Sequence, residues 1–161
     1  MKTSLIKKCS ITLLASACSV ITAFAAPYEK GQKVDAFKAE DQFGVAYTFS
    51  PDTTEYLLVS LDMETGKKAN AALTALGKDH LINKKAVYLA NIHGMPGVGR
   101  MFAIPKMKKY AHRIILGDDE ALMAKFPQQG GKVTVLKLSK GKIQSVAYWT
   151  PGTDAVDDFL K

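Results

Sequence analysis

The stretch Tyr56-Leu57-Leu58-Val59-Ser60-Leu61 decides the fold, because it is short and nearly all apolar. Such a run is typical of a strand that is buried on both faces. Residues 69–76 then carry apolar side chains at positions i, i+3, i+4 and i+7, and Gly77 can end this helix. Residues 86–92 form a second apolar run, rich in branched and aromatic side chains. The three segments predict a βαβ unit with parallel strands and a right-handed crossover.

The rest of the chain continues the alternation of strands and helices. Interleaved elements of this kind predict an α/β protein, a three-layer α/β/α sandwich with a mixed central sheet. We expect these further elements: a turn at 41–44 and a strand at 45–49, a short helix opened by Pro105 and running to Tyr110, a strand at 113–116, a helix capped by Asp118 or Asp119, a hairpin of 132–138 and 142–149, and a last helix capped by Thr153 with Val156, Phe159 and Leu160 on one face.

The first 25 residues have the layout of an export signal. Three lysines precede an uncharged apolar run from Ile11 to Phe24, and Ala23-Phe24-Ala25 supplies the small residues that a signal peptidase reads. The run is shorter than the roughly 20 residues that a membrane-spanning helix needs, and no other segment comes close. We expect residues 1–25 to be a signal peptide. Residues 26–161 then form the single domain of an exported protein, periplasmic or, without an outer membrane, secreted.

Both cysteines, Cys9 and Cys18, lie in the predicted signal. Its removal leaves 136 residues with no disulfide, thiol nucleophile or thiolate metal ligand. Lipoprotein processing at Cys18 is an alternative, but the branched residue before it sits one position too far back. Three lysines and no acids leave with the signal, so the net charge falls from +7 to +4. A charge this small, with aromatic residues not interleaved among the basic ones, argues against a nucleic-acid partner.

The pattern of elements resembles the thioredoxin-like superfamily, in particular its redoxin branch of peroxiredoxins and exported thiol-disulfide reductases. The resemblance rests on the segments 31–44, 57–62, 86–92, 113–118 and 133–143, and so covers most of the mature chain. Enzymes of this family place a reactive cysteine just after the central strand and a cis-proline just before the terminal hairpin. Here those places hold Asp62–Lys68 and Gln129-Gly130-Gly131-Lys132. The resemblance therefore implies the fold without the residues of the redox site.

A narrower likeness is to small exported proteins sometimes labelled flavin-containing dehydrogenases. It rests on Asp62-Met63, Met95-Pro96-Gly97 and Ile104-Pro105-Lys106-Met107. This likeness implies FMN or FAD as a cofactor, which we keep as an alternative hypothesis.

The loop after the central strand is the first candidate site. In open α/β sheets, ligands bind beyond the carboxyl ends of the strands, where a helix N-terminus offers N–H groups. Gly66 allows close approach of the backbone, and Lys67 adds positive charge. We expect Asp62, Met63, Gly66 and Lys67 to contribute to a site for a protein partner or a small anionic ligand. The plain alternative is a former active-site loop that is now only solvated.

The glycine-rich segment Gly94-Met95-Pro96-Gly97-Val98-Gly99 is the second candidate. It follows a strand, but its spacing is G-x-x-G-x-G and not the G-x-G-x-x-G of dinucleotide loops. Acids arrive about twenty residues on only at Asp118 and Asp119, in a turn. We expect the glycines to serve a tight loop, with Met95, Pro96 and Arg100 adding to the same binding edge.

A third candidate is copper binding by His93, Met95, Met101 and His112, since imidazole and thioether groups are copper ligands. Methionines near helical spacing are more often packing residues, and this copper site stays a weaker alternative. No hydrolase motif is present in the sequence. The sequence predicts a redox-inactive thioredoxin-like binding or accessory module without a cofactor. Lys67→Glu and Arg100→Glu are expected to weaken partner binding and to leave the melting temperature nearly unchanged.

Overall fold

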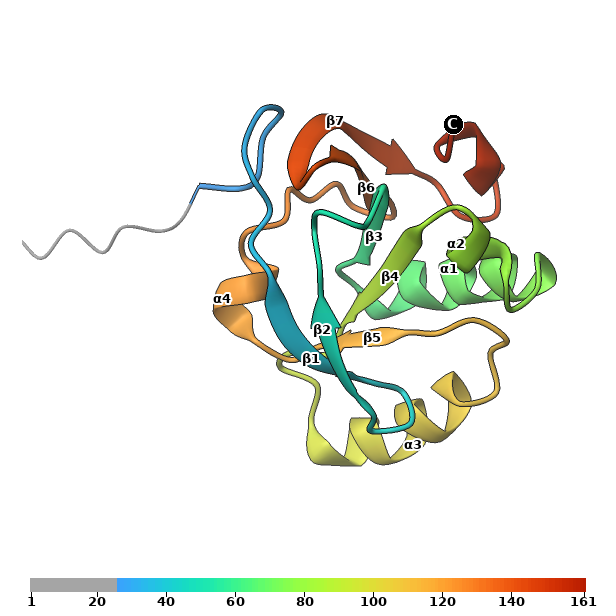
Figure 1. The fold of residues 1–161 in the computed structure, drawn as a ribbon. Helices are drawn as coiled ribbons and strands as arrows, with labels where there is room; N and C mark the ends of the chain where they lie inside the picture. The colour runs from blue at the N-terminus through green and yellow to red at the C-terminus, as the bar shows by residue number, and fades with distance from the viewer. Residues whose placement is uncertain (1–25) are drawn as a thin grey trace, which may run out of the picture.

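The computed structural model describes residues 26–161, and the predicted signal peptide lies outside the described residues. One mixed sheet has the strand order β2-β1-β5-β4-β3-β6-β7 (Figure 1). Its strands are β1 (Phe37–Asp41), β2 (Ala46–Phe49), β3 (Tyr56–Ser60), β4 (Ala86–Asn91), β5 (Ile115–Gly117), β6 (Val133–Ser139) and β7 (Lys142–Trp149). The helices are α1 (Met63–Ala75), α2 (His80–Asn83), α3 (Gly97–Met107), α4 (Glu120–Met123) and the 3-10 turn η1 (Val156–Asp158).

The central strand β3 is buried along its whole length. It pairs in parallel with β4, from Tyr56 opposite Ala86 to Ser60 opposite Ala90, and antiparallel with β6. β4 in turn pairs in parallel with β5. The predicted parallel βαβ unit is therefore confirmed, with α1 as its crossover.

Two antiparallel hairpins flank this parallel centre. β6 and β7 are joined through Lys140 and Gly141, which have φ values of 49° and 75°. Two successive left-handed residues match the twist of the flanking strands, as in the type I′ turns that favour glycine. β1 and β2 form the other hairpin, and β1 also pairs antiparallel with β5.

The sheet separates two apolar cores, which confirms the three-layer α/β/α sandwich with a mixed sheet. Ala69 and Leu73 of α1, Leu81 of α2 and Val156 of η1 pack on one face. On the other face, α4 and the segment before β1 cover the sheet through Met123 of α4 and through Tyr28, Val34 and Phe126. Figure 1 shows α1 and α2 on one side of the sheet and α4 on the other.

Several details differ from the sequence prediction. Phe37–Asp41 was not predicted as a strand, because four of its five residues are the poor strand formers Lys, Ala, Glu and Asp. Pairing with both β2 and β5 overrides that preference. The helix predicted to open at Pro105 begins instead at Gly97, and Pro105 lies inside α3. Met101 and Pro105 are both exposed, so water can bond the Met101 carbonyl that Pro105 leaves without its helical donor.

The predicted last helix is also wrong in length and cap. Thr153 lies in a turn in which its own N–H and that of Asp154 bond to the Thr150 carbonyl. Only the 3-10 turn η1 follows, and its N-cap Ala155 offers no side-chain bond. Among residues 26–161, no helix is long and apolar enough to cross a membrane.

Candidate functional site

A cleft of about 270 Å³ lies between α1 and α3, at the carboxyl ends of β3 and β4. It contains five of the seven residues that the sequence analysis selected for the binding edge, namely Asp62, Met63, Gly66, Lys67 and Met95. The remaining lining residues are Ser60, Asn70, Ala90, Asn91, Gly99, Phe102, Ala103, Lys106, Met107 and Tyr110.

Asp62 begins helix α1. Its backbone is extended, and its carboxylate accepts a hydrogen bond of 2.8 Å from the Thr65 N–H, as an N-cap residue does. Glu64 adds a second acid in the first turn, with Lys67 and Lys68 at 3.9 Å from its carboxylate. The helix end is therefore already occupied by acidic groups, which makes its N–H groups poor partners for an anion.

Gly66 brings α1 close to the sheet. A Cβ at this position would lie 3.4 Å from Ser60 Oγ and 3.8 Å from the Tyr88 hydroxyl. The Tyr88 hydroxyl donates a 2.8 Å hydrogen bond to Ser60 Oγ beneath the helix. Burial raises the pKa of Tyr88, so its hydroxyl stays protonated.

Asn70 and His112 form a buried polar pair beside the floor of the cleft. His112 Nε2 lies 3.0 Å from Asn70 Oδ1, and His112 Nδ1 lies 3.5 Å from Thr74 Oγ1. Burial lowers the pKa of His112 to about 4, so the ring is neutral at neutral pH and donates to Asn70 from Nε2. This bond fixes the Asn70 amide, whose Nδ2 group has no hydrogen-bond partner among the described residues.

Helix α3 forms the opposite wall and has no fully buried residue. Phe102 lines the cleft and is still 64% exposed. Gly99 allows the loop before the helix to fold back, since a Cβ there would lie 3.1 Å from Met95 Cγ. Met95 therefore reaches the cleft because its neighbour in α3 is a glycine.

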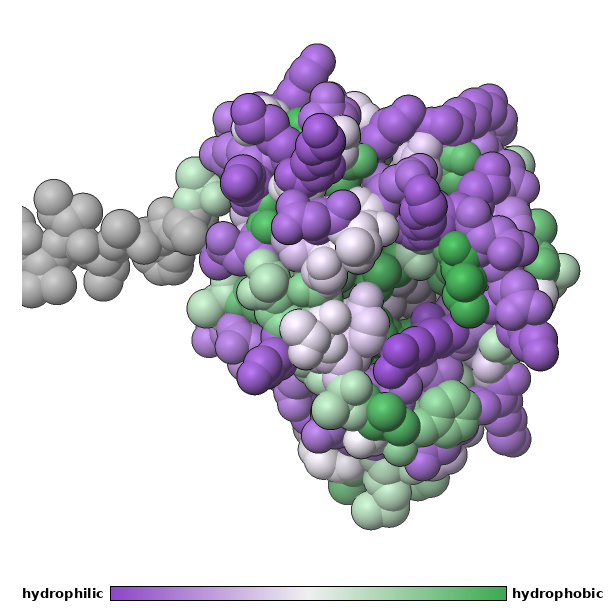
Figure 2. Space-filling view, in the orientation of Figure 1, coloured by the Kyte–Doolittle hydropathy of each residue, from purple (hydrophilic) through white to green (hydrophobic). Residues whose placement is uncertain are grey.

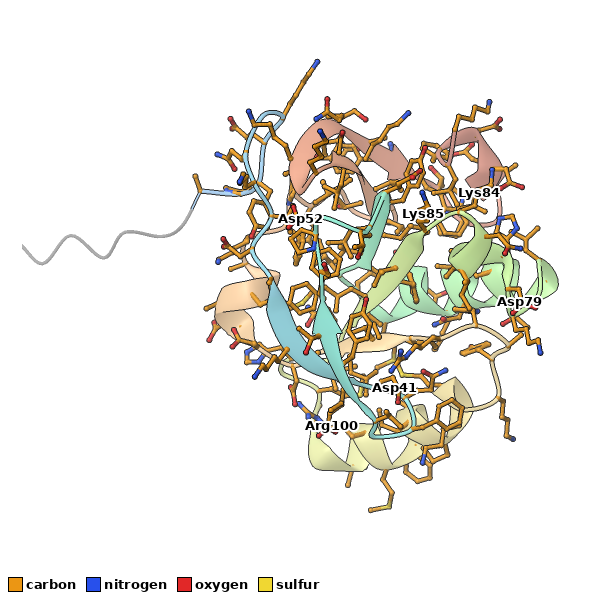
Figure 3. The ribbon with its side chains drawn as sticks, in the orientation of Figure 1. Asp41, Asp52, Asp79, Lys84, Lys85 and Arg100 are labelled. Atoms are coloured by element: carbon orange, nitrogen blue, oxygen red, sulfur yellow. The ribbon has the colours of Figure 1, made fainter. Side chains whose placement is uncertain are left out.

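Arg100 and Pro96 do not line this cleft. Pro96 is the N-cap of α3, and Arg100 bonds the carbonyls of Ile92 and Met95 at 3.2 and 3.0 Å. Figure 3 shows Arg100 on α3. Its guanidinium also makes a bidentate ion pair with Asp118, which lowers the pKa of that carboxyl. Arg100 thus holds the β4–α3 loop to the end of β5, which is a structural role.

The copper and nucleotide alternatives are not favoured by these positions. Both ring nitrogens of His112 face Asn70 and Thr74, while Nε2 of His93 lies 3.8 Å from Glu120. Within residues 26–161 no group of three or more His, Asp or Glu side chains could hold a metal ion. Asp118, the acid that a nucleotide site would need, is already bound by Arg100.

The floor of the cleft was not predicted from the sequence. Ser60 was a detectable signal, because it is a small hydroxyl residue at the end of the apolar strand β3, between Val59 and Leu61. Asn70 and Thr74, four residues apart, are a second signal: they place two polar groups on the buried side of α1. Phe102 could not be assigned, because its helix was expected to begin only at Pro105.

No protein-family model matches the sequence, and no curated protein does. Among solved structures, the chain is similar to peroxidoxin BcpB from Mycobacterium tuberculosis, with 14% identity, a TM-score of 0.55 and coverage of 82% of this chain and 94% of that one. It is also similar to a peroxiredoxin-like protein from Aquifex aeolicus (10% identity, TM-score 0.56, coverage 85% and 88%). A third similar structure is the thioredoxin domain of a thiol-disulfide oxidoreductase from Bacteroides vulgatus (14%, 0.53, 83% and 99%).

These similarities show that the fold is thioredoxin-like, of the kind found in peroxiredoxins and thiol-disulfide oxidoreductases. At such low identity they show the fold alone. Residues 26–161 contain no cysteine, and the residue directly after β3 and Leu61 is the helix cap Asp62.

Proposed function

We propose that this protein is an exported, redox-inactive thioredoxin-like binding module, and that the cleft between α1 and α3 is its binding site. The observation that carries the proposal is the composition of that cleft. Its walls bear the apolar side chains of Met63, Met95, Phe102 and Met107, whereas its floor bears the polar Ser60 and Asn70. Ligand sites typically combine apolar walls with a few fixed polar groups in this way.

The polar floor of the cleft favours a ligand that accepts a hydrogen bond. Asn70 is only 3% exposed, and its Oδ1 is taken by His112, so its Nδ2 donor is the group left for a ligand. Asn70 lines the cleft, so an acceptor atom of a ligand can bond to this donor. Ser60 supplies a second hydroxyl at the same depth.

The side chains at the rim of the cleft favour a ligand with negative charge. Lys67 and Lys106 line the cleft from its two helices, and the single lining carboxylate, Asp62, is bonded to the α1 backbone. We infer a ligand or partner side chain with an apolar body and an acceptor or anionic end. A volume of 270 Å³ suits a small ligand or one anchoring side chain of a protein, since sites for drug-sized molecules start at about 300 Å³.

A fluorescence titration with 8-anilinonaphthalene-1-sulfonate, an apolar aromatic sulfonate, tests the cleft. We expect saturable binding to the folded protein and at least about tenfold weaker binding for Ala103→Phe, which places a large ring in the cleft. Ala121→Phe is the matched control, because Ala121 is an exposed alanine of the helix α4. Equal binding by both variants, or none by the wild type, would contradict the proposal.

An absorbance spectrum of the same preparation tests the flavin alternative. We expect no flavin band in the purified protein and no spectral shift when FMN or FAD is added. A bound flavin would replace the present proposal with an oxidoreductase function. Metal analysis of the sample tests copper in the same way.

A further inference from the structure

Most of the exposed large apolar side chains gather at one end of the molecule. Phe43 and Val45, in the turn between β1 and β2, and Val98, Met101 and Phe102 of α3 are each 55–69% exposed. Phe43 and Gly44 share a hollow with Ile104 and Lys108, so the turn lies against α3. Figure 2 shows hydrophobic atoms over this lower end, and we call these five side chains the apolar end.

Helix α3 presents its apolar stripe outward. At about 100° per residue, Val98, Met101, Phe102 and Pro105 fall on one side of the helix. Met107 packs on the core from the other side. An apolar stripe that faces solvent indicates a surface that contacts a membrane or another molecule.

Positively charged side chains lie at the C-terminal end of this apolar stripe. Lys106, Lys108 and Lys109 are exposed at the C-terminal end of α3, and none forms an ion pair among residues 26–161. Of the four acids of the adjoining hollow, Asp118 pairs with Arg100, Asp41 pairs with Arg113 and Asp119 caps α4. The fourth, Glu40, is exposed in the same hollow as Lys38 and Lys108, so the lysines remain in excess there. The end of the molecule is therefore apolar and cationic together.

We propose that the apolar end docks on an anionic lipid surface. Apolar side chains of an interfacial helix enter the boundary between headgroups and acyl chains, and nearby lysines are attracted to lipid phosphates. A second copy of the chain is the poorer occupant, because a symmetric contact sets the same patch against itself and would bring two sets of lysines together. This inference does not depend on a ligand in the cleft.

Cosedimentation with lipid vesicles tests the docking. The protein is purified as the cell processes it, and its N-terminus is read by mass spectrometry, because an uncleaved apolar signal would bind lipid itself. We expect binding to vesicles of phosphatidylglycerol and phosphatidylcholine that salt weakens, and much weaker binding to phosphatidylcholine alone. Lys106→Glu and Lys109→Glu should each weaken binding at least about fivefold.

Met101→Glu should also weaken binding at least about fivefold, whereas Ile82→Glu on α2 should not. Both residues are 68% exposed, so the two variants make the same change at equal exposure on different surfaces. Both should melt at the wild-type temperature. Absence of vesicle binding by the wild type, or equal binding by both variants, would overturn the proposal.

Sedimentation equilibrium of the lipid-free protein tests whether a second copy of the chain covers the apolar end instead. A dimer that Met101→Glu dissociates would assign the surface to a second copy and overturn the lipid proposal. The cleft is tested separately, because Ala103→Phe changes the cleft and leaves Val98 and Met101 in place. Failure of one proposal is therefore distinguishable from failure of the other.

Discussion

Single polar residues in apolar surroundings define the chemistry of this protein. Ser60, Asn70 and His112 are each at most 3% exposed, and each has a hydrogen-bond partner. Buried polar groups are costly unless they are bonded, so such residues fix one arrangement of the chains around them. Here they fix the orientation of Asn70, and with it the donor offered to the cleft.

His112 should make the stability of the protein depend on pH. Burial holds its pKa at about 4, below the value of 6.5 in the unfolded chain. Between these values the unfolded state binds a proton that the folded state does not, so the free energy of unfolding falls as the pH falls from 6.5 to 4. The loss is up to about 3 kcal/mol, since each tenfold difference in proton affinity between the two states corresponds to about 1.4 kcal/mol.

Urea unfolding at a series of pH values measures this dependence. His112→Gln should remove this part of the slope, whereas the control His93→Gln should keep it. Carboxylates with lowered pKa values, such as Asp41, add a loss of stability in the acid range to all three proteins alike. A slope unchanged in His112→Gln would show that this histidine is not the source.

At the scale of elements, helix α3 is held mainly at its two ends. Met107 and the following Tyr110 pack on the core at one end, and Arg100 bonds the preceding loop and Asp118 near the other. The first two turns of the helix thus depend on Arg100 for their position. Lys67, in contrast, is 61% exposed on α1 and has only Glu64 at 3.9 Å.

Charge reversal should distinguish the two cations. Contrary to the expectation from the sequence, we expect Arg100→Glu to lower the melting temperature clearly, because it breaks the bonds to the Ile92 and Met95 carbonyls and to Asp118 and sets two carboxylates together. Lys67→Glu should leave that temperature nearly unchanged and should weaken the binding of anionic probes to the cleft. Thermal melts followed by circular dichroism provide the measurement. An unchanged melting temperature for Arg100→Glu would mean that the ion pair does not hold α3 in solution.

At the scale of the whole molecule, the protein is a thioredoxin-like sandwich with a cleft. Among the described residues, the only sulfur atoms that line this cleft are the thioethers of methionines. Removal of residues 1–25 would leave the whole chain without a thiol. Dithiol chemistry needs cysteines that residues 26–161 do not supply.

The processed protein should therefore have no thiol-disulfide activity. We expect insulin reduction in the presence of dithiothreitol to proceed at the rate of a control without protein. N-terminal sequencing identifies the processing site of the same sample. Reduction above the control by a chain that begins after Ala25 would contradict the expectation.

The sequence by itself determined the elements whose signals are local. The apolar run of β3, the helical spacing in α1 and the glycine turn between β6 and β7 depend on neighbouring residues, and together they predict the parallel βαβ unit and the sandwich. Asp62, Met63, Gly66, Lys67 and Met95 were assigned to one edge because the carboxyl ends of parallel strands meet there.

Only the tertiary structure decided what depends on distant residues. The Gln42 side chain joins the end of β1 to His112 and Ile114, about seventy residues away, and Asn70 meets His112 across 42 residues. The position of α3, a helix that runs through Pro105, also depends on a distant pair, since Arg100 meets Asp118 across 18 residues. Such pairings have no local signature, because their free energy comes from burial and hydrogen bonds that exist only after the sheet has formed.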